Sequence, residues 1–260
     1  MCCLFLAASS TVAIAQTNVV DLVNPIIGTN GMGHTFPGAC VPFGLVQLSP
    51  DTDTIPHNVD GKYQPRSYEY CAGYQHKDSS IVGFSHTHFS GTGHSDLGDI
   101  LIMPTTGTLK LNPGTATDPD GGYRSRFSHD TEISRPGYYE VMLADYGVKA
   151  QLTTTQRVGI HKYTYPTNSE NQRVILDMIH GIYNYDGKVL WTSIRIENDT
   201  LVTGYRITNG WARTNYTYFA MSFSKPITHY GCEEKAKVNY RGGYAKFNMK
   251  ENFPDIGGRK

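Results

Sequence analysis

Residues 83–99 hold the densest run of chemically active side chains, with the sequence GFSHTHFSGTGHSDLGD. His86 and His88 would point to one face if this segment is extended. Together with His94 and Asp96 they could ligate zinc, although no Cys or Glu stands at metal-ligand spacing. The same imidazole, carboxylate and hydroxyl groups could instead hydrogen-bond the hydroxyls of a sugar, or only tie the loop together.

Two further segments precede this run. Residues 24–39 (NPIIGTNGMGHTFPGA) are rich in glycine but lack the third glycine of a dinucleotide-binding loop and a following helical pattern. Such a loop lets the backbone approach a ligand or another segment closely. Residues 68–74 (YEYCAGY) place tyrosines beside a carboxylate, which suits stacking against a pyranose ring. With 18 tyrosines in the chain, the bland interpretation is that these are strand and rim residues.

Acidic residues could also support glycoside hydrolysis, which needs two carboxylates at a set separation. The candidates are Asp51, Asp53, Glu69, Asp78, Asp96 and Asp99. The spacing along the chain does not give their separation in space. The chain contains no G-x-S-x-G nucleophile elbow.

The elements that must position these groups are predicted to be strands. Val148, Ala150 and Leu152 alternate with polar residues, and residues 190–196 and 218–223 alternate in the same way. Turn signals stand at 186–187, 198–199 and 209–210, and the first of them predicts a tight hairpin joining 182–185 to 189–196. No window has sustained helical periodicity, so we expect one all-β domain, an antiparallel β-sandwich.

The amino-acid composition excludes some classes of protein. In 260 residues the 23 basic and 23 acidic side chains cancel, which argues against a nucleic-acid-binding protein. The aromatic content of 12% argues against global disorder. No run of the sequence approaches the roughly 20 consecutive apolar residues that a membrane helix needs.

The first 15 residues, MCCLFLAASSTVAIA, are typical of a secretory signal peptide that lacks its basic start, with cleavage expected before Gln16. The remaining Cys40, Cys71 and Cys232 permit at most one internal disulfide. We therefore expect a secreted protein whose stability comes from its core.

Taken together, these segments resemble the N-terminal domain of glycoside hydrolase family 92, which comprises secreted bacterial exo-acting alpha-mannosidases. The matching stretches cover nearly all of the chain after residue 16, and the run GFSHTHFSGTG followed by DLGD carries the most specific likeness. The stretches are 23–29, 33–53, 71–74, 81–104, 122–130, 136–141, 180–185 and 210–214.

The resemblance implies a calcium-dependent, inverting enzyme of two domains, an N-terminal β-sandwich and a C-terminal (α/α)6 barrel. It also implies a location in the periplasm or at the cell surface of a bacterium. In that family the barrel supplies the catalytic acid, the base and the calcium ligands, and the sandwich supplies loops around the sugar. It implies that Tyr70 and Cys71, with the loop carrying His86, His88, His94 and Asp96, face the barrel. Many relatives have Trp where this chain has Tyr68 or Tyr70, which leaves the details of the pocket open.

The chain stops at Lys260, before a barrel could follow. We therefore expect a truncated or split frame: a signal peptide over 1–15 and the sandwich over 16–260, with no catalytic residue and no bound metal of its own. Such a domain would be inactive alone and would expose an apolar patch where the barrel docks.

Two alternatives belong to other classes. The first is a free-standing carbohydrate-binding module for mannose-containing glycans, which would bind oligosaccharides without a partner. The second is an independent zinc enzyme that uses His86, His88 and His94, which would contain stoichiometric zinc.

Overall fold

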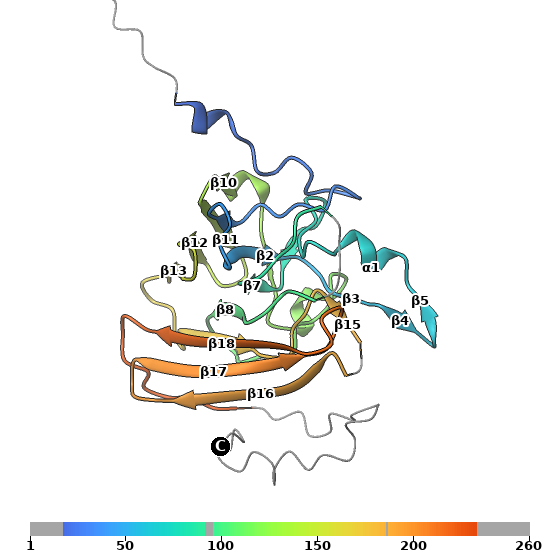
Figure 1. The fold of residues 1–260 in the computed structure, drawn as a ribbon. Coiled ribbons are helices and arrows are strands. Elements are labelled where there is room, and N and C mark those ends of the chain that lie inside the picture. Colours follow the sequence, from blue (N-terminus) through green and yellow to red (C-terminus); the bar gives the residue numbers. More distant parts are fainter. Residues whose placement is uncertain (1–17, 92–95, 186, 233–260) are drawn as a thin grey trace, which may run out of the picture.

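The computed structural model describes residues 18–91, 96–185 and 187–232, and within them the fold is almost entirely β. Figure 1 shows the strands gathered into one body, from which the N-terminal segment leads away. Three short 3-10 turns and one short helix complete the described elements: η1 (Val19–Leu22), η2 (Pro119–Gly121), η3 (His129–Thr131) and α1 (Arg66–Glu69).

Two antiparallel sheets form the sandwich. The first has the order β1-β2-β7-β8-β14 and the second the order β10-β11-β12-β13. The strands of the first are β1 (Ala39–Cys40), β2 (Gln47–Asp51), β7 (Gly83–Ser85), β8 (Leu101–Thr105) and β14 (Arg173–Asp177). Those of the second are β10 (Ile133–Arg135), β11 (Tyr138–Leu143), β12 (Val148–Thr154) and β13 (Gly159–Thr164).

The core lies between these two sheets. Strand β12 buries Val148, Ala150 and Leu152 completely, as the alternation in the sequence predicts. They pack with Leu48 of β2, Phe84 of β7, Leu101 and Met103 of β8, and Tyr139, Val141 and Leu143 of β11. Because apolar side chains from both sheets fill one cluster, the all-β sandwich prediction is confirmed.

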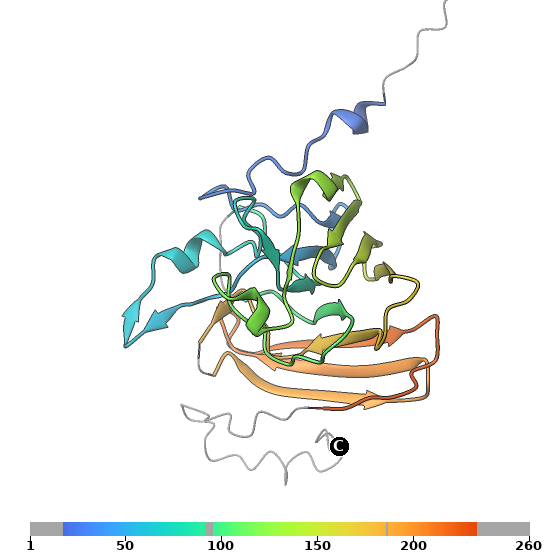
Figure 2. The same ribbon diagram turned by 180° about the vertical axis from the view of Figure 1, so that it is seen from behind.

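A third antiparallel sheet, β16-β17-β18, forms a separate layer next to the sandwich (Figures 1 and 2). Its strands are β16 (Val189–Ile196), β17 (Leu201–Thr208) and β18 (Asn215–Ser222). The predicted turns at 198–199 and 209–210 join these strands. An irregularity between Val189 and Trp191 shifts the register between β16 and β17.

Three two-stranded pairs complete the fold: β3 (Ile55–Pro56) with β15 (Tyr183–Asn184), β4 (Asn58–Val59) with β5 (Lys62–Tyr63), and β6 (Ser80–Ile81) with β9 (Ser125–Arg126). The hairpin predicted between 182–185 and 189–196 is wrong. Strand β15 pairs in parallel with β3, and β16 pairs with β17. A turn is present, since the Lys188 N–H donates to the Tyr185 carbonyl. The strand before this turn, β15, pairs with the distant β3 instead of with β16.

Cys40, Cys71 and Cys232 are free thiols. The described part of the chain has no helix long and apolar enough to cross a membrane. The predicted signal peptide at 1–15 lies outside the described residues.

Candidate functional site

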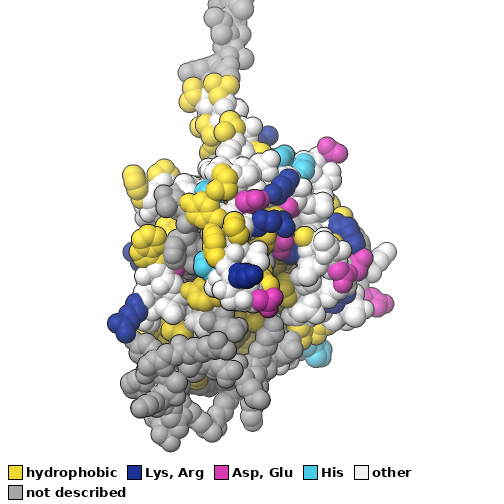
Figure 3. All heavy atoms as spheres, turned by 90° about the vertical axis from the view of Figure 1, so that its right-hand side faces the viewer, with side chains coloured by type: hydrophobic (Ala, Val, Ile, Leu, Met, Phe, Trp, Pro, Cys, Tyr) yellow, Lys and Arg dark blue, Asp and Glu magenta, His cyan; other side chains and the backbone are white. Residues whose placement is uncertain are grey.

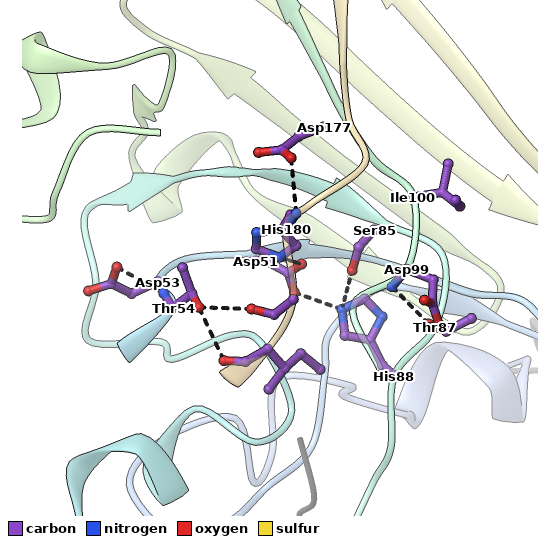
Figure 4. A network of polar contacts seen from close by, with 12 residues as sticks. Asp51, Asp53, Thr54, Ser85, Thr87, His88, Asp99, Ile100, Asp177 and His180 are labelled. Carbon is purple, nitrogen blue, oxygen red and sulfur yellow. Dashed lines mark hydrogen bonds and ion pairs between the residues drawn. The ribbon is translucent and has the colours of Figure 1, made fainter. Parts of the chain in front are cut away.

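The carboxylate of Asp51, at the end of β2, is the centre of a buried polar network (Figure 4). Its Oδ1 lies 2.8 Å from Nε2 of His88, and its Oδ2 lies 2.8 Å from Nε2 of His180. All three side chains are buried. Burying a carboxylate is costly unless it is paired and hydrogen-bonded, and here both oxygens are.

The partners of His88 define its charge. Its Nδ1 lies 2.7 Å from the backbone carbonyl of Gln47, which can only accept, and its Nε2 faces the Asp51 carboxylate. Burial alone would raise the pKa of Asp51. The charge of His88 and the hydrogen bonds from both histidines outweigh burial, so the pKa lies well below its ordinary value. Since both ring nitrogens of His88 face oxygens that accept, each nitrogen is placed to donate, and the ring is paired with the Asp51 carboxylate.

Gly73 lies directly over this pair. Its φ is +81°, and a Cβ placed on it would come 2.0 Å from Oδ1 of Asp51 and 3.1 Å from Cδ2 of His88. Only glycine fits such a backbone and such a close approach. Four of the sequence segments singled out above (33–53, 68–74, 83–99 and 180–185) thus meet at one carboxylate.

A second ion pair extends the network. Arg206 of β17 is fully buried, and its Nε lies 2.9 Å from Oδ1 of Asp99. The contact is an ion pair without good hydrogen-bond alignment. The other Asp99 oxygen accepts from Oγ1 of Thr87 at 2.8 Å, and Arg206 Nη1 donates to the His180 carbonyl at 2.6 Å. Nearby, burial and then Arg206 lower the pKa of the buried Lys188 to about 7.

His86 lies in a different environment from His88, although β7 ends just before both, at Ser85. Nδ1 of His86 is 2.7 Å from the Ile100 carbonyl, and its Nε2 is 3.0 Å from Nε2 of His161. Nδ1 of His161 is in turn 2.7 Å from the hydroxyl of Tyr163. The rings of His86 and His88 therefore do not share a face of a strand, and they do not converge as metal ligands.

One assignment of protons satisfies this second group. The Tyr163 hydroxyl donates to His161, His161 Nε2–H donates to His86, and His86 Nδ1–H donates to Ile100. In this arrangement both imidazoles are neutral. Burial accordingly lowers the pKa of His86 and brings that of His161 well below its ordinary value.

Tyr70 and Cys71 are buried beneath the surface of their loop. The Tyr70 hydroxyl donates to Oδ1 of Asp78 at 3.1 Å, and burial followed by Asp78 raises the pKa of Tyr70. Cys71 packs against Ile182, and burial raises its pKa to about 11. A thiol in this state is a poor nucleophile.

Asp96 holds a neighbouring loop. Its Oδ1 accepts from the backbone N–H of Trp211 at 2.6 Å, and its Oδ2 accepts from that of Ala212 at 2.8 Å. Gly210 is needed here because a Cβ would come 1.8 Å from Oδ1 of Asp96. The ring of Trp211 is 74% exposed. His94 lies outside the described residues.

The surface next to the network carries aromatic and histidine side chains. His34 packs edge-on against Tyr68 at 4.6 Å, and Phe36 lies 5.3 Å from His88 between ring centroids. Nε2 of the buried His34 has no hydrogen-bond partner among the described residues. Figure 3, which views the side that carries α1 and the β4–β5 pair, shows hydrophobic side chains gathered across the middle of the face among charged groups.

The other acidic candidates are also engaged. Asp53 pairs with Arg124 at 2.9 Å, and Glu69 pairs with Lys77 at 2.6 Å. Asp78 accepts from Tyr70, and Asp99 and Asp96 have the partners given above. Each of these candidate carboxylates therefore has a partner within the described residues that helps to hold a loop.

A family model for the glycosyl hydrolase family 92 N-terminal domain matches residues 22–254. The chain belongs to glycosyl hydrolase family 92. Its N-terminal domain is the part of that family present here.

Two comparisons with solved structures agree. A family GH92 alpha-mannosidase from Bacteroides thetaiotaomicron, solved in complex with mannoimidazole, is 45% identical, with a TM-score of 0.73 over 81% of this chain. A GH92 family glycosyl hydrolase named ccman5 is 25% identical, with a TM-score of 0.59 over 78% of this chain. Among curated proteins, an uncharacterized secreted glycosidase of Arthroderma benhamiae is 29% identical over 180 residues.

This family 92 chain spans only part of its relatives. It covers 26% of each of the two solved chains and 20% of the curated protein. The activity, substrates and partners of the whole enzymes therefore enter below as proposals.

Several residues of the family 92 domain were missed by the sequence analysis. His180 and Arg206 complete the buried network, and Trp211 forms an exposed aromatic next to the loop of Asp96. Arg206 gave a usable signal, because it is a charged residue inside a strand-like alternation whose neighbours on the same face are apolar or small. No local signal marks His180 as a partner of a residue 129 positions earlier.

The acidic candidates considered above do not fit a calcium ion. Calcium takes six to eight oxygen ligands. The described carboxylates above are committed to imidazole, guanidinium, ammonium, hydroxyl or backbone N–H groups. The one group with metal-ligand geometry in the described part is His76, His129 and Glu132, which offers two nitrogens and one carboxylate.

Proposed function

We propose that this chain is the N-terminal domain of a secreted alpha-mannosidase that hydrolyses alpha-mannosidic bonds, with inversion, in N-glycans or mannan. Its role is to form one wall of the sugar cleft, and a C-terminal (α/α)6 barrel supplies the acid, the base and the calcium site. The observation that carries the proposal is the 45% identity and the TM-score of 0.73 to an alpha-mannosidase of which this chain spans 26%.

The geometry supports a positioning role. The buried, charged pair of Asp51 and His88, together with His180, holds three loop segments against the end of β2. Loops held in this way keep their outer residues in place at little entropic cost when a ligand binds. The residues on offer at the surface are Tyr68 and Trp211, and the buried His34 packs edge-on against Tyr68. Aromatic faces of this kind suit pyranose rings.

The chain alone should be inactive, because an inverting glycosidase needs two carboxylates that act on the sugar and a water. Secretion is supported by the predicted signal peptide and by the curated relative, which is named a secreted glycosidase.

A domain exchange tests the proposal. The chain from residue 16 replaces the corresponding quarter of the Bacteroides thetaiotaomicron alpha-mannosidase, and hydrolysis of an aryl alpha-mannoside is measured with calcium. The matched controls are that enzyme without its N-terminal quarter and this chain alone. We expect turnover from the exchanged enzyme and none from either control.

Robust turnover by the chain alone would show that the catalytic groups lie within it. A folded but inactive exchange enzyme, together with tight binding of mannose oligosaccharides by the chain alone in calorimetry, would favour the free-standing carbohydrate-binding module. Replacing Trp211 by Ala in the exchanged enzyme should raise KM more than it lowers kcat if the ring contacts sugar.

A further inference from the structure

A second cluster of histidine and carboxylate side chains lies a few residues beyond Gly73, where the loop between α1 and β6 meets η3. His76, His129 and Glu132 each offer one ligand atom, and these atoms all lie within 4.8 Å of one another. The cluster joins segments more than fifty residues apart in the sequence.

The carboxylate of Glu132 is buried and held by hydrogen bonds. Its side chain is only 3% exposed. Oε1 accepts from the hydroxyl of Tyr139 at 2.6 Å, and the hydroxyl of Tyr74 lies 2.9 Å from Oε1 and 3.0 Å from Oε2. Both tyrosines are buried. Hydrogen bonds of this kind orient the carboxylate ligands of metal centres.

The two histidines complete the cluster on its solvent side. Their ring centroids lie 4.0 Å apart with the planes inclined at 36°, and Nδ1 of His129 lies 2.7 Å from Oε2 of Glu132. His76 is half-buried and His129 is exposed. Two imidazoles this close repel each other when both are protonated, but both can be neutral around a shared cation.

We propose that His76, His129 and Glu132 bind a divalent transition metal, with zinc as the expected ion and water completing the shell. Two imidazole nitrogens and one carboxylate are ligands that zinc uses, with bonds of about 2.0–2.2 Å. Three such ligands in tetrahedral geometry stand roughly 3.4 Å apart, so only a small contraction of the cluster is needed. The exposed rim by His129 provides the entry path and room for water.

A metal here ties the loop after Gly73 to the start of β10. Glu132 immediately precedes β10, and Tyr139 lies on β11, whereas His76 belongs to the loop that covers Asp51. The ion would therefore connect β10, at the edge of the second sheet, to the loop that carries Gly73 and His76. Its role would be structural, because binding only the folded chain raises its stability.

The test uses the whole chain, purified without a polyhistidine tag and stripped with a chelator. Zinc is titrated by calorimetry, and cobalt is added separately to follow its visible absorption. We expect one zinc per chain, a rise in Tm of about 5 °C or more at a hundredfold excess over Kd, and a cobalt spectrum of a low-coordinate site.

His129→Gln removes an exposed ligand and should leave the fold intact, so it is the decisive variant. It should weaken zinc affinity at least tenfold and abolish the rise in Tm. His229→Gln, at an exposed histidine beside Thr228, is the matched control and should bind as the parent does. Zinc binding below one tenth of an ion per chain, or equal affinity in His129→Gln and the parent, would overturn the proposal.

Discussion

His86 and His88 stand two residues apart in one motif, yet one ring is paired with a carboxylate and the other with a neutral imidazole. His88 is enclosed between the Gln47 carbonyl and the Asp51 carboxylate, so it carries a positive charge. His86 lies between the Ile100 carbonyl and a second imidazole, that of His161, so it is neutral. The motif supplies two rings of the same chemistry, and their partners decide what each ring does.

The comparison teaches that this motif organises structure from within. The charged pair connects β2 to loops from three other segments, whereas the neutral pair connects the end of β7 to β13 of the opposite sheet. Both ring nitrogens of each histidine already have a partner within the described residues. The chemistry that a ligand meets must come from the outer residues that these pairs hold in place.

The largest expected effect is from removing the charge of Asp51. Asp51→Asn leaves His88 and His180 buried without their anion, and breaking a buried pair from one side costs about 3–5 kcal/mol. Unfolding in urea measures this loss. Asp120→Asn breaks an ion pair to Arg126 at the surface, where Asp120 is 75% exposed, and should leave the unfolding midpoint unchanged. Equal effects of the two variants would contradict the assignment of Asp51 as the hub.

Gly73→Ala tests the same hub through the backbone. Both Gly73 and Gly61 have left-handed φ angles, +81° and +76°. A Cβ on Gly73 would strike Asp51, whereas a Cβ on Gly61 would meet nothing within 4 Å. Each substitution carries a backbone strain of about 1–3 kcal/mol. Gly73→Ala should cost about 2 kcal/mol more than Gly61→Ala in the same urea titration. If the two cost the same, the close approach to Asp51 has no energetic weight.

Acidification should affect the His86–His161 pair and the Asp51–His88 pair in different pH ranges. The pKa values of His86 and His161 are lowered in the folded chain, so below the ordinary histidine pKa of about 6.5 the unfolded chain binds more protons. Stability is therefore full above that pH and is lost as the pH falls below it, by up to about 1.4 kcal/mol per pH unit for each histidine. The lowered pKa of Asp51 instead contributes stability above about pH 4 that is lost only in stronger acid.

His161→Gln isolates the neutral pair. Between about pH 7.5 and pH 5.5 the free energy of unfolding of this variant should fall less steeply than that of the parent, since a titrating group has been removed. Parallel curves would show that His161 titrates alike in the folded and unfolded chains.

The smallest expected effect is at Asp96. Asp96→Asn replaces a carboxylate that accepts from two backbone N–H groups by an amide with one accepting oxygen, and should cost about 1–2 kcal/mol. Hydrogen exchange should accelerate at the amides of Trp211 and Ala212 and stay unchanged at the amides of β12. Acceleration throughout the core would mean that Asp96 supports more than this loop.

Much of the fold could be predicted from the sequence because alternation reports burial directly. Val148, Ala150 and Leu152 are the clearest case, since one face of β12 meets the core. The hairpin at 186–187 failed because turn residues signal a reversal of the chain and do not specify which strand pairs with which. Strand β15 found its partner in β3, more than a hundred residues earlier.

The candidate site was predicted less well, for a physical reason. Residue type shows what Asp96 or Tyr70 can donate or accept, and only the fold shows that nearby groups already use that capacity. The convergence of Asp51, His88, His180 and Gly73 depends on contacts over long separations, which spacing along the chain does not encode.

The charge of His88 is the claim on which this account depends most, and nitrogen NMR of the imidazole side chains tests it directly. At neutral pH, His88 should show two protonated ring nitrogens, and His86 should show one, at Nδ1. Assignment follows from Asp51→Asn, which should perturb the His88 signals and leave those of His86 nearly in place. A neutral His88 with a single ring proton in the folded chain would contradict the account.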